Sequence, residues 1–246
     1  HAPVNPPRRF VEMYDPAALP APRRNPGEDP RGLGLSDDDW RRVRAFYYAL
    51  VSHVDDQVGR ILDALDKAGI AEQTLVLFTS DHGEHLGDHG LVQKGPPGLD
   101  SCAHVPMLLR LPGLVRPEAR HEALVEQVDV APTILDFCGV QSPPFFQGRT
   151  FRPLLEGRPY RERASVFMEL KVPFSHSWKT VRSHMWKYAR RHSGEERLYD
   201  LVDDPHELRN VAADPASAAM LHEARAELLR RWFDVESQYP PRTAQY

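Results

Sequence analysis

The sequence has little cysteine, no long apolar run and little net charge. Cys102 and Cys138 are its only two cysteines, too few for a disulfide framework, so we expect two ordinary reduced thiols. No segment approaches the roughly 18 consecutive apolar residues of a membrane-spanning helix. The formal net charge of −4 argues against nucleic acid or an anionic membrane as a main partner. We therefore expect a globular protein with neither kind of partner.

The first half predicts one long helix and two buried strands. Ser36 followed by three aspartates is typical of a helix N-terminus, and Gly69 is placed to end that helix. Short apolar runs at 74–79 and 104–111 predict strands buried on both faces, and 130–137 predicts a short helix. This order indicates an α/β fold with a mostly parallel sheet flanked by helices. The helix should bury one apolar stripe, made of Val43, Tyr47, Leu50, Val54, Val58, Ile61 and Leu65.

A different pattern begins near residue 160. Short mixed segments at 165–170, 178–183, 185–190 and 197–201 predict a small antiparallel sheet with one solvent-exposed face. Apolar residues at helical spacing from Leu221 to Trp232 then predict a final amphipathic helix. We expect the main domain to span 1–158, and a small C-terminal α+β subdomain to span 159–246.

The loop after the first predicted strand is rich in groups that bind metals. Two metal readings compete. His85 and His89 are four residues apart, as in zinc peptidases, but glycines interrupt the stretch and the glutamate stands at the wrong position. Asp81 and His82 at the strand tip suit a divalent ion, with Lys94 as a cation for an anionic ester. A third reading is a polar surface loop without a metal, which residue types alone favour.

Several segments resemble the sulfatases, which belong to the alkaline-phosphatase-like superfamily. Residues 80–97 resemble the second metal motif of that family, read here as Ser-Asp-His-Gly-Glu, then Leu-Gly-Asp-His-Gly-Leu, then Lys-Gly-Pro-Pro. Residues 47–62, 105–113, 128–136 and 198–210 resemble further family segments in the same order. The resemblance covers most of residues 40–215 and implies an alkaline-phosphatase-like fold, here incomplete.

The resemblance also implies roles for particular residues. Asp81 and His82 match metal ligands, and the Asp-His pair is closest to the branch of phosphonate monoester hydrolases and related arylsulfatases. Ca²⁺ or Mn²⁺ is expected ahead of Zn²⁺ or Mg²⁺. Lys94 and His1 match the residues that contact the sulfate or phosphate ester and take part in catalysis. Neighbouring side chains are expected to orient the ligands: Glu84, His85, Asp88 and His89.

Two elements of the family are absent from this sequence. The Cys-x-Pro-x-Arg or Ser-x-Pro-x-Arg segment, whose Cys or Ser becomes the formylglycine nucleophile, does not occur, and neither does the first metal motif. The chain starts at His1 without Met, so we expect the C-terminal part of a metal-dependent sulfuric ester hydrolase. Its partners would be the N-terminal half of the same enzyme and a small anionic ester, with a homo-oligomer left open. The alternatives are a phosphonate or phosphate ester hydrolase and a non-catalytic truncated relative.

Overall fold

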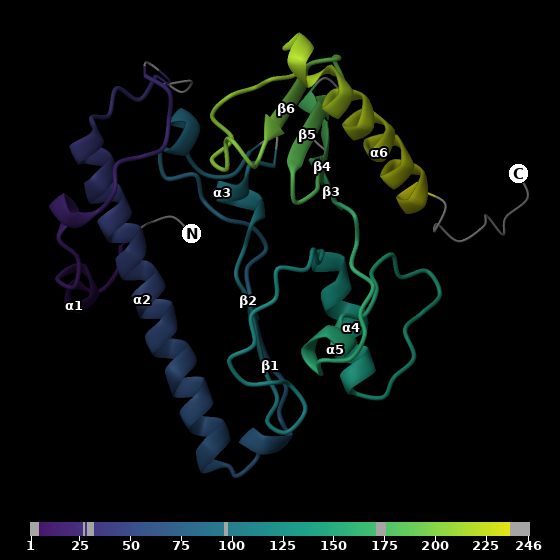
Figure 1. Ribbon diagram of the computed structural model, residues 1–246. Coiled ribbons are helices and arrows are strands. Elements are labelled where there is room, and N and C mark those ends of the chain that lie inside the picture. Colours follow the sequence, from purple (N-terminus) through teal and green to yellow (C-terminus); the bar gives the residue numbers. More distant parts are fainter. Residues whose placement is uncertain (1–4, 27, 29–31, 96–97, 171–175, 237–246) are drawn as a thin grey trace, which may run out of the picture. The chain divides into compact units, whose positions relative to one another are not determined.

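The computed structural model describes residues 5–26, 28, 32–95, 98–170 and 176–236 (Figure 1). These residues form two compact units. The first unit contains the described residues up to Val76 together with His82–Lys94, and the second contains Leu77–Asp81 together with the described residues from Gly95 onward. The boundary predicted after residue 158 does not correspond to this division into two units, and it stays a prediction. None of the described helices is long and apolar enough to cross a membrane.

The first unit is built on one long helix. It contains α1 (Arg8–Val11), η1 (Pro16–Ala18), α2 (Asp37–Lys67) and η2 (Ala71–Gln73). The predicted start of α2 is confirmed, because Ser36 Oγ accepts from the Asp39 amide at 3.1 Å and the Asp39 carboxylate accepts from the Ser36 amide at 3.1 Å. Gly69 follows the helix with a φ of +68°, a conformation that glycine adopts without strain.

The buried face of α2 differs from the predicted one. Val54 and Ile61 are 51% and 62% exposed, whereas Trp40, Ala45 and Ala49 are buried. The buried positions lie in the first half of α2, and the helix as a whole contacts α1 and η1. The expected stripe was therefore wrong, because a periodic pattern shows that a helix has an apolar face but not which part of it a neighbouring segment covers.

The second unit begins with two short strands and the helices that follow them. Strands β1 (Val76–Thr79) and β2 (Met107–Arg110) form a two-stranded sheet. Helix η3 (Asp88–Gly90) comes earlier in the chain and belongs to the first unit. In the second unit α3 (Asp100–Ala103) precedes β2, and η4 (Gln127–Asp129) leads into α4 (Val130–Phe137) and then α5 (Arg152–Leu155).

The predicted strands and the helix at 130–137 are thus confirmed, but the mostly parallel sheet is not. Among the described residues no further strand joins β1 and β2. Phe78 and Leu108 are 37% and 59% exposed, so these strands are not covered on both faces as expected.

The C-terminal part of the second unit is an antiparallel sheet covered by a helix, as predicted. The strands β3 (Val166–Leu170), β4 (Trp178–Arg182), β5 (Trp186–Arg191) and β6 (Glu196–Asp200) lie in that order, and all neighbours are antiparallel. Helix η6 (Pro215–Ser217) leads into α6 (Ala218–Glu236), which packs on β3, β4 and β5 (Figure 1).

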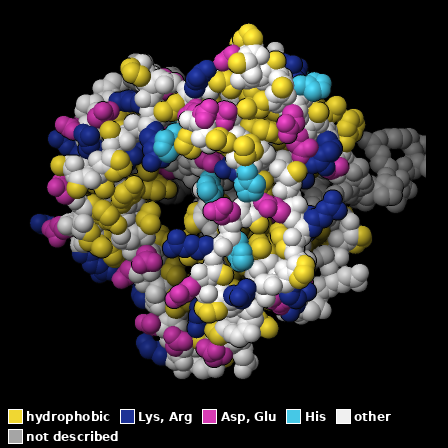
Figure 2. Space-filling model, viewed as in Figure 1, with side chains coloured by type: hydrophobic (Ala, Val, Ile, Leu, Met, Phe, Trp, Pro, Cys, Tyr) yellow, Lys and Arg dark blue, Asp and Glu magenta, His cyan; other side chains and the backbone are white. Residues whose placement is uncertain are grey.

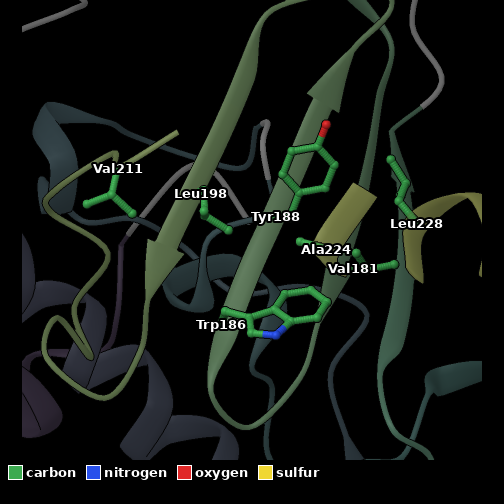
Figure 3. Packing of buried hydrophobic residues seen from close by; sticks show 7 residues of the cluster. All are labelled: Val181, Trp186, Tyr188, Leu198, Val211, Ala224 and Leu228. Atoms are coloured by element: carbon green, nitrogen blue, oxygen red, sulfur yellow. The ribbon is translucent and has the colours of Figure 1, made fainter. Parts of the chain in front are cut away.

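Both faces of this sheet are covered, in contrast to the expected single wet face. Val181, Tyr188 and Leu198 lie opposite one another on three neighbouring strands and are fully buried. They pack with Ala224 and Leu228 of α6 in one apolar cluster (Figure 3). Because side chains alternate along a strand, Lys187, the residue before Tyr188 in β5, lies on the opposite face, where it is also fully buried.

A charged group on β6 makes the stability of this subdomain depend on pH. The Glu196 carboxylate accepts hydrogen bonds from Arg225 at 2.8 and 2.5 Å and another from Tyr188, and these contacts lower its pKa from 4.5 to about 2. The unfolded chain therefore binds the proton at a higher pH than the folded chain does. The stabilisation is present above pH 4.5 and is lost as the pH falls towards 2.

We expect Glu196→Gln to lower the free energy of unfolding at pH 7 by about 1–2 kcal/mol, allowing for solvent screening of this partly exposed pair. At pH 3 the variant and the wild-type chain should differ less. Urea unfolding followed by tryptophan fluorescence at both pH values measures this, with Glu223→Gln on exposed α6 surface as the control. Equal losses at pH 7 and pH 3 would contradict the assignment.

Candidate active site

The candidate metal and substrate residues lie at the end of β1 and in the loop that follows. The strand ends at Thr79, and Asp81 stands two residues beyond it in the second unit. His82 and Lys94 are the first and last residues of the loop that belongs to the first unit. His1 lies outside the described residues, so its predicted role is untested.

His82 and Lys94 are brought together although 12 positions separate them. The Lys94 Nζ atom lies 3.2 Å from His82 Nε2, and His82 Nδ1 lies 2.8 Å from the Gly83 carbonyl oxygen. A carbonyl can only accept and an ammonium can only donate, so Nδ1 carries the proton and Nε2 presents its lone pair. Lys94 is exposed and His82 is half-buried.

This tautomer fits metal binding through Nε2. Histidine ligands usually donate their other ring N–H to a carbonyl or carboxylate, which fixes the ring, and Gly83 supplies such a carbonyl here. The carboxylate of Asp81 is the adjacent oxygen donor in sequence. Over the described ranges, no group of three or more His, Cys, Asp or Glu side chains is arranged to hold a metal ion. The chain thus offers two ligand types that suit a divalent cation.

The loop between His82 and Lys94 is held by Glu84 and Asp88. The Glu84 carboxylate accepts from the amides of Leu86 and Gln93, which closes the loop on itself. Asp88 forms an ion pair with Arg44 of α2, and its carboxylate also accepts from the Arg23 amide at 2.7 Å. Glu84 and Asp88 therefore shape the loop that carries His82 and Lys94, and their action on the ligands themselves stays a prediction.

The zinc-peptidase reading fails on geometry. His85 and His89 do not share a helix, because His89 has a φ of +56° and the only helical turn between them is the short η3. A Cβ on Gly87 would lie 2.7 Å from the Trp40 ring, so the chain passes Trp40 at a distance that only glycine allows. The loop is an irregular turn fitted against the start of α2.

Gln127 is a contact residue that the sequence analysis did not single out. Its side-chain Nε2 donates to the Ser80 carbonyl at 2.5 Å and to the Asp81 carbonyl at 3.0 Å. A surface glutamine carries no chemical signal of its own. The available hint was its position, directly before the Val128-Asp129 segment that resembles the family.

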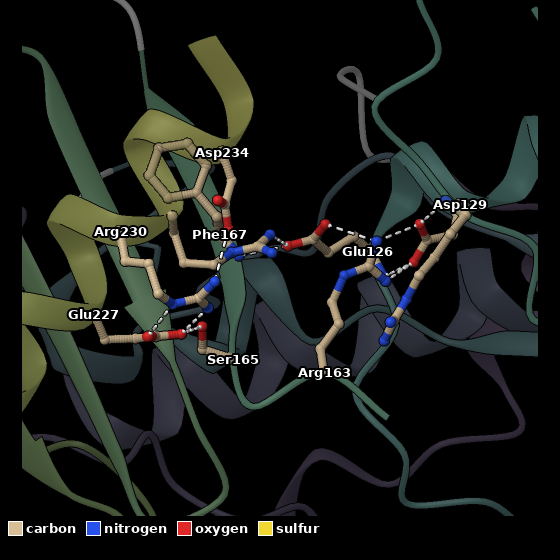
Figure 4. Close-up of polar contacts among 10 residues, drawn as sticks. Glu126, Asp129, Arg163, Ser165, Phe167, Glu227, Arg230 and Asp234 are labelled. Atoms are coloured by element: carbon tan, nitrogen blue, oxygen red, sulfur yellow. Dashed lines mark hydrogen bonds and ion pairs between the residues drawn. The ribbon is translucent and has the colours of Figure 1, made fainter. Parts of the chain in front are cut away.

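In sequence Gln127 lies between Glu126 and Asp129, whose carboxylates belong to a buried ion cluster (Figure 4). Asp129 is fully buried and pairs with Arg163, whose Nη2 lies 2.6 Å from it. Arg231 of α6 donates to Glu126 at 2.5 Å. Burial alone would lower the pKa of Arg163, but the hydrogen bond to Asp129 and nearby negative charges raise it overall.

A second buried cluster surrounds Lys187. Its Nζ donates to the Gly98 carbonyl at 3.0 Å and to the Asp100 carboxylate at 2.5 Å, and it pairs with Glu207. Glu207 in turn accepts from the Asp100 amide at 2.7 Å. Burial alone would raise the pKa of Asp100, but the Lys187 charge and its hydrogen bond lower it overall. This cluster fixes the segment that begins a few residues after Lys94.

Comparison with known proteins decides the family. The sulfatase profile matches residues 1–140, and the profile of the N-sulphoglucosamine sulphohydrolase C-terminal region matches residues 87–233. The chain belongs to the sulfatase family. Sulfatases are in general metal-dependent, and the roles of Asp81 and His82 as metal ligands stay predictions.

Relatives with known names include both sulfatases and phosphonate hydrolases. An arylsulfatase of Clostridium perfringens is 31% identical over 86% of this chain and 47% of the relative. The phosphonate monoester hydrolase of Silicibacter pomeroyi superposes with a TM-score of 0.85 at 31% identity, over 94% of this chain and 53% of that one. The phosphonate monoester hydrolase of Agrobacterium radiobacter gives 0.87 at 28% identity, over 97% and 55%.

This sulfatase-family chain therefore spans about half the length of the relatives it matches. The α/β fold agrees with these structures, whereas the described residues contribute only two strands besides the antiparallel sheet.

Proposed function

We propose that the polypeptide containing this chain is a metal-dependent hydrolase that cleaves sulfate monoesters. The observation that carries the proposal is the contact between Lys94 and His82, which puts a cation for an anionic ester beside an imidazole whose Nε2 suits a metal. Sulfatases among the relatives support the sulfate ester as substrate class.

Asp81 and His82 would hold the divalent ion, with Ca²⁺ or Mn²⁺ ahead of Zn²⁺ or Mg²⁺. When bound, the ion would supply positive charge for the non-bridging oxygens of the ester. The Lys94 ammonium would stabilise the negative charge that develops on the leaving oxygen, and His1 would contact the substrate. Asp81 and Lys94 thus have separable tasks, ion binding and charge stabilisation.

The N-terminal half of the same enzyme is the proposed partner, and it would carry the formylglycine nucleophile and the first metal motif. Apolar side chains support this, because Val54, Ile61, Phe78 and Leu108 are all exposed on the described chain. Figure 2 shows one face on which apolar side chains reach the surface among charged groups of both signs. Neighbouring strands and helices from that half would remove such surface from water.

The phosphonate monoester hydrolases among the structural relatives favour a second function, hydrolysis of phosphonate or phosphate esters by the same site. The third candidate is a non-catalytic relative that binds the ester without cleaving it. Both would use the same Asp81, His82 and Lys94.

One set of assays separates the three functions. We expect the full polypeptide encoded by the gene to hydrolyse p-nitrophenyl sulfate faster than p-nitrophenyl phenylphosphonate, to lose activity with EDTA and to regain it with Mn²⁺ or Ca²⁺. The 246-residue chain alone should hydrolyse neither ester, because two ligands and a lysine lack a nucleophile. Faster phosphonate turnover would favour the second function, and no turnover of either ester by the full polypeptide would favour the third. Turnover by the 246-residue chain alone would refute the shared site.

A further inference from the structure

We propose that Gln127 is a positioning residue for the metal ligand Asp81. The inference rests on the proposed function, since it needs Asp81 to bind an ion. Both hydrogen bonds of the Gln127 amide go to consecutive backbone carbonyls, those of Ser80 and Asp81. The amide thereby fixes the peptide units on both sides of the Asp81 α-carbon, from which the carboxylate projects.

The backbone of Gln127 is itself fixed by its two neighbours. The Asp129 carboxylate accepts from the Glu126 amide at 2.8 Å, and the Asp129 amide donates to the Glu126 carbonyl at 2.9 Å. These two bonds close the short turn of η4 around Gln127. Because the first and last residues of the turn are bonded to each other, the turn can hold the Gln127 side chain in one orientation.

The ends of the turn are anchored to the C-terminal part of the second unit. The Glu126 carboxylate accepts from the Phe167 amide of β3 at 2.7 Å and from Arg231 of α6 at 2.5 Å. Asp129 accepts from Arg163 and from the Arg149 amide at 2.8 Å. Figure 4 shows the two carboxylates facing guanidinium groups that come from different segments. The cluster thus links the antiparallel subdomain to the backbone of Asp81.

A close backbone contact limits how far the turn can move. A Cβ atom on Gly148 would lie 1.9 Å from the Val128 carbonyl oxygen and 2.8 Å from the Asp129 amide nitrogen. The segment at Gly148 therefore touches the turn directly, main chain against main chain, and leaves no room for a side chain. This contact and the ion cluster hold the same turn from two directions.

The chemistry of the contact requires a hydrogen-bond donor at position 127. Carbonyl oxygens only accept, so the side chain must supply N–H donors, and the glutamine amide has two of them. Glutamate has the same length but cannot donate when ionised, and it would place a negative charge against two carbonyl oxygens. Methionine keeps the length and removes both donors. These two substitutions separate loss of the hydrogen bonds from loss of size.

The test measures ion binding directly in the full polypeptide, freed of metal. Titration calorimetry with Mn²⁺ is expected to show about 10- to 100-fold weaker binding for Gln127→Met and at least as large a loss for Gln127→Glu. The matched control is Gln147→Met, which removes another amide-to-carbonyl bond of the same unit, from Gln147 Nε2 to Val235 O at 2.9 Å. That control should bind Mn²⁺ like the wild type.

Turnover at saturating Mn²⁺ provides the second measurement. Because Gln127→Met disturbs only the position of a ligand, excess Mn²⁺ should restore kcat to within about threefold, with an unchanged melting temperature. Wild-type Mn²⁺ affinity in both Gln127 variants would overturn the proposal. So would an equal loss in Gln147→Met, since the effect would then be a general loss of stability.

The outcome for Asp81→Ala separates this inference from the proposed function. If Asp81→Ala loses Mn²⁺ binding while the Gln127 variants keep it, only the positioning role fails. If the wild-type polypeptide binds no Mn²⁺ and needs no divalent ion for hydrolysis, the proposed metal site fails and the positioning role fails with it.

Discussion

Replacing Asp81 by alanine is expected to lower ester hydrolysis by the full polypeptide about 10³-fold or more. A metal ion contributes several kcal/mol to the stabilisation of a transition state, and each 1.4 kcal/mol or so corresponds to about a tenfold rate. The carboxylate stands two residues past the end of β1, where its loss would remove an oxygen ligand without opening a core. Initial rates with p-nitrophenyl sulfate measure the effect. Asp55→Ala, on an exposed position of α2, is the control and should retain full activity.

The companion substitution Lys94→Met distinguishes ion binding from charge stabilisation. It should lower kcat by about 10²–10³-fold, the usual cost of removing one group that stabilises a developing oxyanion. Mn²⁺ binding should be kept or become tighter, because the lysine ammonium no longer competes for the lone pair of His82 Nε2. Equal loss of Mn²⁺ affinity in Asp81→Ala and Lys94→Met would contradict the separate roles. Full activity of Asp81→Ala would refute the metal site.

Replacing Lys187 by methionine should destabilise the chain by about 3–5 kcal/mol. The lysine is fully buried, and its removal leaves the buried Glu207 carboxylate without this cation and Asp100 with Arg182, 3.4 Å away. Methionine fills nearly the same volume, so the loss comes from the uncompensated charges and not from a cavity. Urea unfolding at pH 7, followed by tryptophan fluorescence, gives the free energy.

Lys179→Met on the neighbouring strand is the matched control. Lys179 also forms an ion pair, with Glu169, but both side chains are partly exposed, so the expected loss is about 1 kcal/mol or less. Adding Glu207→Gln to Lys187→Met should recover part of the lost stability, because glutamine replaces the buried Glu207 carboxylate by a neutral amide. A loss in Lys187→Met no larger than that in Lys179→Met would show that the buried cluster contributes little.

Local sequence patterns predicted the elements well. Ser36 and its aspartates marked the start of α2 correctly, and the four short segments after residue 160 became β3 to β6 in the expected antiparallel order. These features depend on residues near one another in the chain, so capping chemistry and side-chain alternation are sufficient to find them.

The burial of each helix and strand face was harder to predict. The apolar run of β1 looked like a central strand, yet Phe78 is 37% exposed, because coverage depends on segments far away in the chain or outside it. Lys187 lies in a segment that was predicted to have one solvent-exposed face, and only the placement of Asp100 and Glu207 shows why a lysine is buried there. Periodicity carries no information about such partners.

The residues of the candidate site were named from the sequence, and their roles stay predictions. The resemblance named Asp81, His82 and Lys94, and the contact between Lys94 and His82 came from the structure. Gln127 escaped notice because its importance lies in two backbone carbonyls that every sequence has. Residues that act through the main chain leave no motif of their own.

The bonds around Asp100 have a consequence for how the protein is made. Its backbone amide donates to a carboxylate 107 positions further along the chain, at Glu207. At a synthesis rate of about 5–20 residues per second, the ribosome needs about 5–20 s to translate the residues between Asp100 and Glu207. Throughout this time Asp100 lacks the hydrogen bond to Glu207, so the segment around it is accessible to chaperones and proteases in the growing chain. The Asp100 segment is thus completed only by a part of the chain that is translated much later.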